Sequence, residues 1–214
     1  MKSVIFDLDG TLLDTLQDLF FSVNATLEEM GLPLRTKREI RAFLGNGARN
    51  LLQQSLPDHK KDRVDEALAI FQPIYALHSQ DTTSPYPGIT PLLEQLKKDG
   101  FGLGIVSNKP DFAVQTLGKN HFPIIPFAVG EREGIRRKPN PDSVLEAMRA
   151  LGSTQGECVY VGDSEVDVAT AIAAGIPCIA VTWGFRDREA LAEAGATVFA
   201  DTAEELYERI GELI

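Results

Sequence analysis

Short apolar runs rich in β-branched and aromatic residues alternate along this chain with longer stretches of helical spacing. The apolar runs predict strands over 2–8, 101–107, 127–130, 158–162, 177–182 and 197–200. Helical spacing predicts helices over 89–100, from 110, over 141–152, over 164–175 and from 202. Gly100, Gly152 and Gly175 stand where three of these helices end, just before the next strand. The alternation predicts an α/β fold with a doubly wound, Rossmann-like parallel sheet.

One long segment breaks this alternation. From Asp14 to about Thr83 the pattern predicts no strand, and helical spacing covers 16–30, 37–44, 48–56 and 63–80. The following stretch, 81–87, is typical of a linker. We therefore expect an α/β core made of 1–14 and 84–214, with 15–83 inserted as an all-helical cap domain. Such an insert should lie over the C-terminal edge of the sheet, where open α/β folds bind ligands.

Charge and hydropathy narrow the classes of function. The 214 residues carry a net charge of −10, which argues against binding to nucleic acid or to an anionic membrane, because both need a basic surface. Hydrophobic residues make up 43% of the chain, as in soluble globular proteins, and no apolar run is long enough to span a bilayer. Cys158 and Cys178 lie in or beside predicted core strands and are expected as free thiols. We expect a cytoplasmic protein, as a monomer or a homodimer.

The first predicted strand ends in two carboxylates, Asp7 and Asp9, followed by Gly10 and Thr11. Residues two apart on a strand share a face, so both carboxylates leave on the same side. Such a pair repels unless one group is protonated or a cation lies between them. The spacing therefore indicates a divalent metal site with one oxygen free as nucleophile or proton carrier. An ordinary Asp-Gly turn at a strand end is the alternative.

Two further polar clusters precede predicted helices. Ser107 ends the second predicted strand and Asn108 and Lys109 follow it, where a hydroxyl and backbone N–H groups can form an anion cradle. The alternative is a plain Ser/Asn turn. Lys138 stands in a basic segment and can face a phosphate as a point charge, with a solvated basic loop as the alternative.

Asp163 and Asp167 follow the strand predicted over 158–162. Asp163 is a candidate metal ligand, and Asp167 lies one helical turn further on and can return toward the site. Capping of the next helix by Asp163 or Ser164 is the alternative. Together the four clusters supply an acid pair, a hydroxyl, a lysine and a second acid pair. This set can hold Mg²⁺ and a phosphoryl group.

In four motifs the chain resembles the phosphatases of the haloacid dehalogenase superfamily. The motifs are Asp7-Leu8-Asp9-Gly10-Thr11, then Ser107, then Lys138-Pro139, then Gly162-Asp163 with Asp167. The helical insert after the first motif resembles that superfamily's four-helix type of cap. Gly45-Asn46-Gly47-Ala48 and Ser107-Asn108-Lys109-Pro110 look most like the phosphoglycolate phosphatase branch.

The resemblance implies a Mg²⁺-dependent phosphatase that works through an aspartyl-phosphate intermediate. It makes Asp7 the nucleophile, Asp9 the general acid and then base, and Lys138 the cation that neutralises the phosphoryl group. The implied ligands of Mg²⁺ are a carboxylate oxygen of Asp7, the backbone carbonyl of Asp9 and a carboxylate oxygen of Asp163.

The resemblance also implies the substrate contacts. Ser107 and the backbone N–H of Asn108 would bind phosphoryl oxygens, and Thr11 and Lys109 are assigned to substrate binding as well. Asp167 would orient Lys138 or a metal-bound water.

The implied substrate is a small phosphorylated metabolite such as 2-phosphoglycolate, with the cap setting the choice. The residues Gly45, Asn46 and Gly47 are expected in a tight loop that points into the site. Arg49 is expected to bind a substrate carboxylate through its planar guanidinium. A Gly-Asn-Gly turn that only joins two helices is the alternative.

Other functions stay open on the same residues. A sugar-phosphate mutase of the beta-phosphoglucomutase type, a pyrophosphatase and a nucleotidase would share the core motifs. Carbon–halogen hydrolysis has no evident use for Asp9, and phosphonate hydrolysis needs a cap lysine in a motif that is not recognised here. A phosphoryl-binding signalling module of the receiver type is shorter and has no helical insert. A silent binding protein would not need every motif residue intact.

Overall fold

The computed structural model describes all 214 residues of the chain, Met1–Ile214. Six parallel strands form one sheet in the order β5-β4-β1-β6-β7-β8. These strands are β1 (Ser3–Phe6), β4 (Gly102–Pro110), β5 (Phe127–Glu131), β6 (Cys158–Gly162), β7 (Cys178–Val181) and β8 (Val198–Ala200). The chain runs outward from β1 to β5 on one side and from β6 to β8 on the other. The order reverses beside β1, as in a doubly wound fold, so the predicted fold class is confirmed.

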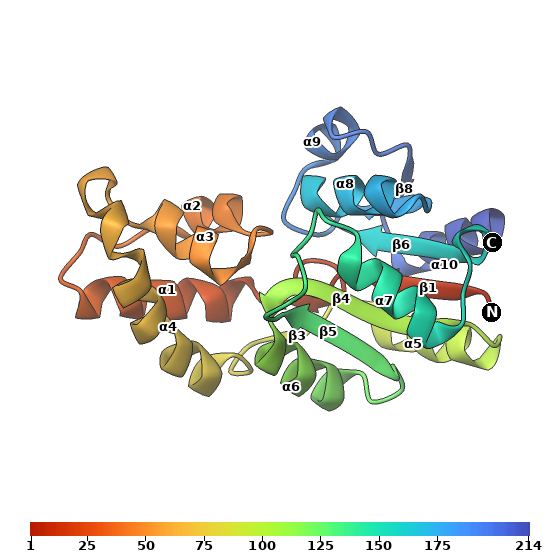
Figure 1. Cartoon of the computed structure of the whole chain (residues 1–214), viewed down its shortest axis with the longest axis horizontal. Helices are drawn as coiled ribbons and strands as arrows, with labels where there is room; N and C mark the ends of the chain where they lie inside the picture. Colours follow the sequence, from red (N-terminus) through yellow and green to blue (C-terminus); the bar gives the residue numbers. More distant parts are fainter.

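Helices cover both faces of the sheet (Figure 1). One face carries α5 (Ile89–Lys98), α6 (Asp111–His121) and α10 (Ala203–Leu213), and the other carries α7 (Asp142–Leu151) and α8 (Glu165–Ala174). The side chains of β1 alternate between these layers, because successive residues of a strand point to opposite faces. Val4 and Phe6 pack with the first set of helices, and Ile5 packs with the second.

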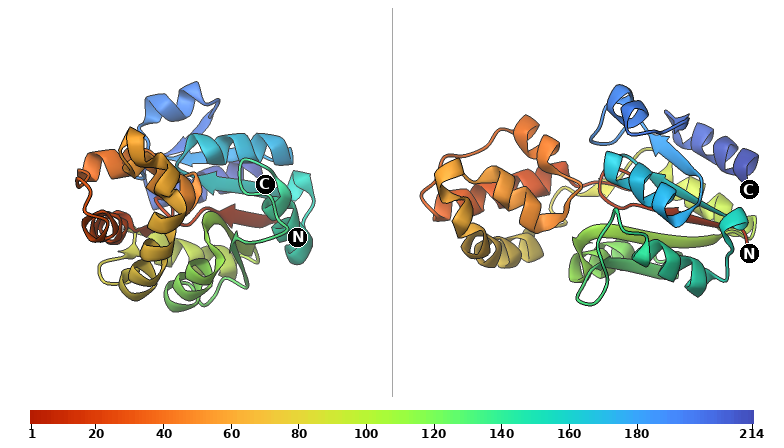
Figure 2. Two further views of the ribbon diagram at one scale, coloured as in Figure 1. Left: turned by 60° about the vertical axis from the view of Figure 1, so that its left-hand side comes forward. Right: turned by 45° about the horizontal axis from the view of Figure 1, so that its top comes forward.

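The segment between the first strand and α5 forms a second group of helices. They are α1 (Leu16–Glu29), α2 (Lys37–Phe43), α3 (Gly47–Ser55), the short 3-10 helix η1 (Asp58–Arg63) and α4 (Val64–His78). We call these five the cap helices. Figure 1 shows them at the left of the molecule, and both chain termini lie at the opposite end. The right-hand view of Figure 2 shows the same division from another direction.

The cap helices bury a hydrophobic cluster of their own. Val23 of α1, Leu52 of α3 and Phe71 of α4 are fully buried in it. Ala113 and Phe185 join this cluster from the part of the chain that carries the sheet. The cap helices are therefore packed on the rest of the molecule through apolar contacts. All helices of the chain are too short or too polar to cross a lipid bilayer.

Several short elements were not predicted from the sequence. β2 (Leu13–Asp14) pairs antiparallel with β3 (Ser84–Pro85), so the segment predicted as a linker over 81–87 contains a strand. The segment predicted to be free of strands likewise begins inside β2. Two-residue strands are too short to show an alternating pattern, which is why the sequence does not reveal them. The helix α9 (Arg188–Glu193) and the single 3-10 turn η2 (Gln155–Glu157) are also too short to be predicted.

The β2–β3 ribbon ties the two ends of the cap segment together. Next to it, the Asp18 carboxylate of α1 accepts hydrogen bonds from the backbone N–H groups and hydroxyls of Thr82 and Thr83, at 2.6–3.1 Å. Burial opposes ionisation of Asp18, but these hydrogen bonds outweigh it and hold its pKa below the usual value. The segment that forms the cap helices therefore leaves the sheet-bearing part of the chain and returns to it at one fixed place.

Candidate active site

Four segments that are distant in the sequence meet beyond the carboxyl ends of the central strands. Asp7 follows β1, Ser107 lies near the end of β4, Asp163 follows β6, and Lys138 lies in the loop between β5 and α7. All four residues are buried. The common edge of the parallel sheet thus brings the four sequence motifs together.

Lys138 lies at the centre of a charged network. Its Nζ donates hydrogen bonds to Asp7 (2.8 Å), Asp167 (2.7 Å) and the Tyr160 hydroxyl (2.9 Å). Burial disfavours the charged form of Lys138, but the charges of Asp167 and Asp7 outweigh burial and raise its pKa well above the usual value. Lys138 is therefore a fixed cation beside Asp7.

Asp167 is bound by the protein on both of its oxygens. Oδ1 accepts the hydrogen bond from Lys138, and Oδ2 accepts from the backbone N–H (3.1 Å) and hydroxyl (2.5 Å) of Ser164. Ser164 is also the N-cap of α8, as the sequence allows. The contact between Asp167 and Lys138 that the resemblance implies is present.

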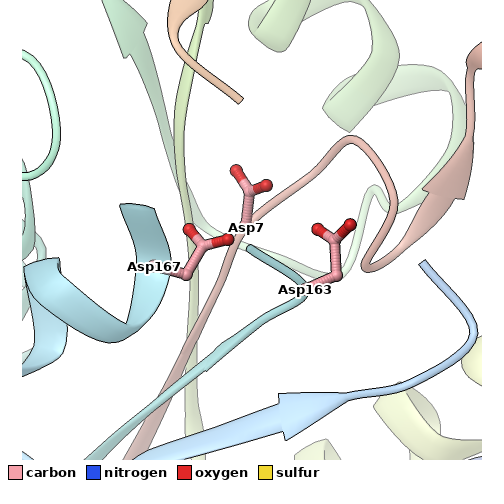
Figure 3. A group of neighbouring side chains, drawn as sticks. All are labelled: Asp7, Asp163 and Asp167. Carbon is pink, nitrogen blue, oxygen red and sulfur yellow. The ribbon is translucent and has the colours of Figure 1, made fainter. Parts of the chain in front are cut away.

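Asp7, Asp163 and Asp167 form a buried acidic group (Figure 3). One carboxylate oxygen of each lies within 4.8 Å of the others, and in this view Asp7 lies between the other two. Burial raises the pKa of Asp7 to about 7 against the lowering effect of Lys138. Burial and the neighbouring acids raise the pKa of Asp163 well above its usual value. Lys138 contacts two of these three acids, Asp7 and Asp167.

This donor set fits a divalent cation. Carboxylate oxygens are the ligands that hard cations such as Mg²⁺ prefer, and a bound cation would relieve the repulsion within the group. Asp167 is already committed to Lys138 and Ser164, so Asp7 and Asp163 have the freer carboxylate oxygens.

Asp163 is held from two sides. The backbone N–H of Phe185 donates to its Oδ2 at 2.7 Å, and the Thr11 hydroxyl donates to its Oδ1 at 3.1 Å. Gly10 and Gly184 lie against the same side chain, where an added Cβ would come within 2.3 Å of Asp163 atoms. Gly10 also has a φ of +84°, which other residues rarely adopt. Glycine is needed at both positions for the carboxylate to fit.

Asp9 is bound by Lys109 and lies outside the acidic group. The Lys109 ammonium is 2.7 Å and 2.9 Å from the two Asp9 oxygens, and its side chain is 2% exposed. It also lies 4.7 Å from the centroid of the Tyr75 ring, which comes from α4. The Tyr75 hydroxyl is buried and has no hydrogen-bond partner. The metal contact predicted for Asp9 is its backbone carbonyl, which is compatible with this side-chain pairing.

Ser107 and Asn108 lie where the pairing of β4 with β5 shifts between Val106 and Pro110. The Asn108 side chain connects two loops. Its Nδ2 donates to the carbonyls of Lys138 (3.0 Å) and Gly45 (3.1 Å), and its Oδ1 accepts from the backbone N–H of Lys138 (2.9 Å). Asn108 therefore holds the backbone of Lys138 in place and touches the cap.

A cavity of about 50 Å³ lies between this edge of the sheet and the cap helices. The core side supplies the polar lining residues Asp7, Asp9, Ser107, Asn108, Lys109, Asp163, Ser164 and Arg186. The cap side is mostly apolar and includes Leu19, Leu51 and Phe71, with Tyr75 as a polar exception. The cavity is small, so it favours small ligands.

The predicted cap loop is only partly at the cavity. Gly45 and Gly47 line it, but Asn46 does not. Arg49 does not line it either, because its guanidinium pairs with Asp65 of α4 at 2.5 Å and is half exposed. The structure therefore does not bring Arg49 to the place where a substrate carboxylate would lie.

Three consecutive carbonyls of this loop accept hydrogen bonds from the core. Arg186 donates to Leu44 (2.7 Å), Asn108 to Gly45 (3.1 Å) and Arg137 to Asn46 (3.4 Å). Arg137, the residue before Lys138, thus connects the basic segment to the cap loop.

The sequence patterns did not identify several residues that belong to the site. Tyr160 and Gly184 belong to strands or strand ends at the same sheet edge, and Gly184 follows β7 in the way that the motif residues follow their strands. Its place after a predicted strand could therefore have marked Gly184 as a site residue. No sequence pattern marks Tyr75 or Arg186, because their places depend on how the cap helices pack.

Comparisons with known proteins agree with this geometry. Residues 4–181 match the family model described as haloacid dehalogenase-like hydrolase. Phosphoglycolate phosphatase 1 of Pseudomonas aeruginosa is 33% identical over 213 residues, which cover 96% of this chain and 78% of that protein. Phosphoglycolate phosphatase of Xanthomonas campestris pv. campestris is 33% identical over 195 residues, covering 86% of this chain and 85% of the relative. A crystal structure of a candidate phosphoglycolate phosphatase from Lactobacillus delbrueckii subsp. bulgaricus is 39% identical, with a TM-score of 0.92 and coverage of 98% and 99%.

Proposed function

We propose that this chain, which belongs to the haloacid dehalogenase-like hydrolase family and is a phosphoric monoester hydrolase, acts on 2-phosphoglycolate or a similar small metabolite with Mg²⁺ as its cofactor. The observation that carries the proposal is Asp7, whose carboxylate lies in the acidic group with Lys138 at 2.8 Å. A carboxylate beside a fixed cation is suited to attack on an anionic phosphoryl group, because the cation offsets the growing negative charge.

In the proposed reaction Asp7 is the nucleophile. Lys138 donates to its Oδ1, and no protein donor binds its Oδ2, so Oδ2 is the oxygen proposed to attack. A bond forms between Asp7 and phosphorus while the ester P–O bond breaks, which gives an aspartyl-phosphate and an alkoxide. Asp9 donates a proton to the alkoxide and later takes one from the water that hydrolyses the intermediate.

The remaining groups position the phosphoryl unit. The Ser107 hydroxyl and the backbone N–H of Asn108 are proposed to bind its oxygens, and Lys138 to neutralise their charge. Asp7 and Asp163, with the backbone carbonyl of Asp9, would hold Mg²⁺, with Thr11 and Phe185 fixing Asp163 by hydrogen bonds. A bound Mg²⁺ supplies positive charge that lets the phosphoryl dianion enter a site rich in carboxylates.

The choice of substrate is supported by size and by the relatives. The cavity of about 50 Å³ favours a small leaving group. The relatives from Pseudomonas and Xanthomonas are named phosphoglycolate phosphatases. We further propose that 15–83 acts as a cap domain on a core of 1–14 and 84–214, and that the enzyme is cytoplasmic, since both cysteines are free thiols.

The test is phosphate release from 2-phosphoglycolate with and without Mg²⁺, beside sugar phosphates, nucleotides, pyrophosphate and an aryl phosphate. We expect Mg²⁺-dependent release, with kcat/KM for 2-phosphoglycolate well above the other esters. Equal activity on all esters would contradict the proposed substrate and leave the reaction standing. An isomerised sugar phosphate without release of inorganic phosphate would indicate a mutase.

A further inference from the structure

We propose that Lys109 and Tyr75 form a subsite that binds the carboxylate of the substrate, an inference that rests on the proposed function. A carboxylated leaving group needs a cation in the cavity. Arg49, which the sequence suggests for this task, is paired with Asp65 and does not line the cavity. Another residue must therefore recognise the second negative charge.

Two cationic side chains line the cavity, Lys109 and Arg186. The guanidinium of Arg186 is already used, because it donates to Glu165 and to the carbonyls of Arg41 and Leu44 at 2.7–3.2 Å. The Lys109 ammonium donates only to the two oxygens of Asp9, so one of its three N–H groups has no acceptor in the structure. Lys109 is therefore the cation that an incoming anion can engage.

Tyr75 adds a second, independent observation. Its residue is 1% exposed, its hydroxyl has no partner, and it lines the cavity beside Lys109. A buried hydroxyl without a hydrogen bond is unfavourable, so such groups are rare in folded proteins. An anionic oxygen placed between the ammonium and the hydroxyl would satisfy Tyr75 and pair with Lys109 at once.

The distance to the reacting atoms fits this role. In the proposed reaction Asp9 contacts the ester oxygen, and Lys109 Nζ lies 2.7 Å and 2.9 Å from the Asp9 oxygens. In 2-phosphoglycolate a single methylene carbon separates the ester oxygen from the carboxylate, so the carboxylate reaches the neighbourhood of Lys109.

Binding of the carboxylate also changes the contacts of Asp9. In the structure Lys109 occupies both Asp9 oxygens. When Lys109 turns to the substrate carboxylate, one ion pair replaces another and the Asp9 oxygens become free to face the leaving oxygen. A substrate with an uncharged leaving group cannot make this exchange, so the subsite favours carboxylated esters.

The experiment compares 2-phosphoglycolate with 2-hydroxyethyl phosphate, which replaces the carboxylate by an uncharged hydroxymethyl group. The quantity measured is the ratio of the two kcat/KM values. We expect Lys109→Met to lower this ratio by about 10- to 100-fold, the range for a lost hydrogen bond to a charged group. Tyr75→Phe should lower it by about 10-fold while the thermal unfolding midpoint stays unchanged, because the hydroxyl has no partner to lose.

The matched control is Lys119→Met on the exposed surface of α6, which should leave the ratio unchanged. If both variants lose activity equally on the two esters, the subsite is overturned and the residues are structural. A wild-type ratio near one, with both esters hydrolysed, overturns the subsite but not the proposed function. Absence of release from either ester overturns both. If Lys109→Met does not fold, the ratio in Tyr75→Phe decides.

Discussion

The backbone N–H of Phe185 binds the Oδ2 of Asp163 at 2.7 Å. The loop after β7 thus reaches across to fix an acid that follows β6. It approaches closely because Gly184, the residue before Phe185, has no side chain to strike Asp163. The position of one proposed metal ligand therefore depends on a glycine that is itself no ligand.

Gly184→Ala tests this dependence. A Cβ at this position would lie 2.3 Å from the Cβ of Asp163, so the carboxylate has to move. We expect the Mg²⁺ concentration for half-maximal activity to rise by about 10- to 100-fold, as for other changes to groups that orient metal ligands. The control is Gly156→Ala, where an added Cβ meets nothing within 4 Å. An unchanged Mg²⁺ requirement in Gly184→Ala would contradict the role of this loop.

Asp7→Asn tests the nucleophile. The amide cannot form the aspartyl-phosphate, so we expect kcat to fall by at least about 10⁴-fold, the scale seen when a nucleophile is removed. The fold should persist, because the change removes a buried carboxyl whose ionisation is disfavoured. Circular dichroism checks the fold, and Asp62→Asn on the exposed surface is the matched control. A rate within a few-fold of wild type would exclude Asp7 as nucleophile.

Asp9→Asn tests the proton transfer. We expect the chemical step to slow by about 10²–10⁴-fold, which is the usual contribution of general acid–base catalysis. The loss should be smaller for an aryl phosphate than for an alkyl ester, because the aryl leaving group needs less protonation. Single-turnover kinetics on both esters measures the difference. Equal losses on the two esters would argue for a structural role of Asp9.

Tyr160→Phe tests how Lys138 is positioned. The Tyr160 hydroxyl accepts a hydrogen bond from Lys138 at 2.9 Å and lies 3.2 Å from the carbonyl of Val106. Its removal leaves these buried groups short of a partner, so we expect a loss of about 1–3 kcal/mol in the free energy of unfolding. The effect on turnover should fall on kcat more than on KM. Urea unfolding and steady-state kinetics give the two quantities, and an unchanged stability would contradict the network.

The stability of the metal-free protein should depend on pH through Asp7. Its pKa rises from the usual 3.8 to about 7 on folding, so between these values the folded chain holds a proton that the unfolded chain has lost. The contribution of Asp7 to the free energy of unfolding therefore falls as pH rises through this range, by up to about 1.4 kcal/mol per pH unit. Added Mg²⁺ should reduce this fall.

The comparison of wild type with Asp7→Asn in the presence of a chelator isolates this contribution. It removes the effect of groups such as Asp18, whose lowered pKa acts in the opposite direction. Urea unfolding at several pH values measures the difference in stability between the two proteins. A difference that stays constant from pH 4 to pH 7 would contradict the raised pKa of Asp7.

The sheet and its helices could be predicted from the sequence, because a sheet that is buried on both faces requires continuous apolar runs in its strands. The strand β6 coincides with its prediction over 158–162, and the glycines predicted to end α7 and α8 have positive φ. The meeting of Asp7, Ser107 and Asp163 at one edge also follows, since parallel strands bring their carboxyl ends together.

The contacts between the cap helices and the core do not follow from the sequence. The pairing of Asp9 with Lys109 joins residues 100 positions apart, and the Tyr75 ring beside them depends on the packing of α4. No local pattern records which side chain of a helix will face a distant loop. For the same reason Arg49 has the right chemistry for a carboxylate and the wrong position, because Asp65 lies near it on the neighbouring helix.

The core grips the cap loop through the carbonyls of Leu44, Gly45 and Asn46, which every amino-acid sequence possesses. These hydrogen bonds do not require a particular side chain at Leu44 or Asn46, but the turn that presents the carbonyls favours glycine at positions 45 and 47, where φ is +106° and +81°. Side chains of the cap helices outside this turn can therefore be exchanged, or another helical unit can be joined to the same turn, while these hydrogen bonds persist. The side chains that the cap helices present to the cavity and the attachment of the loop to the core can in this respect vary separately.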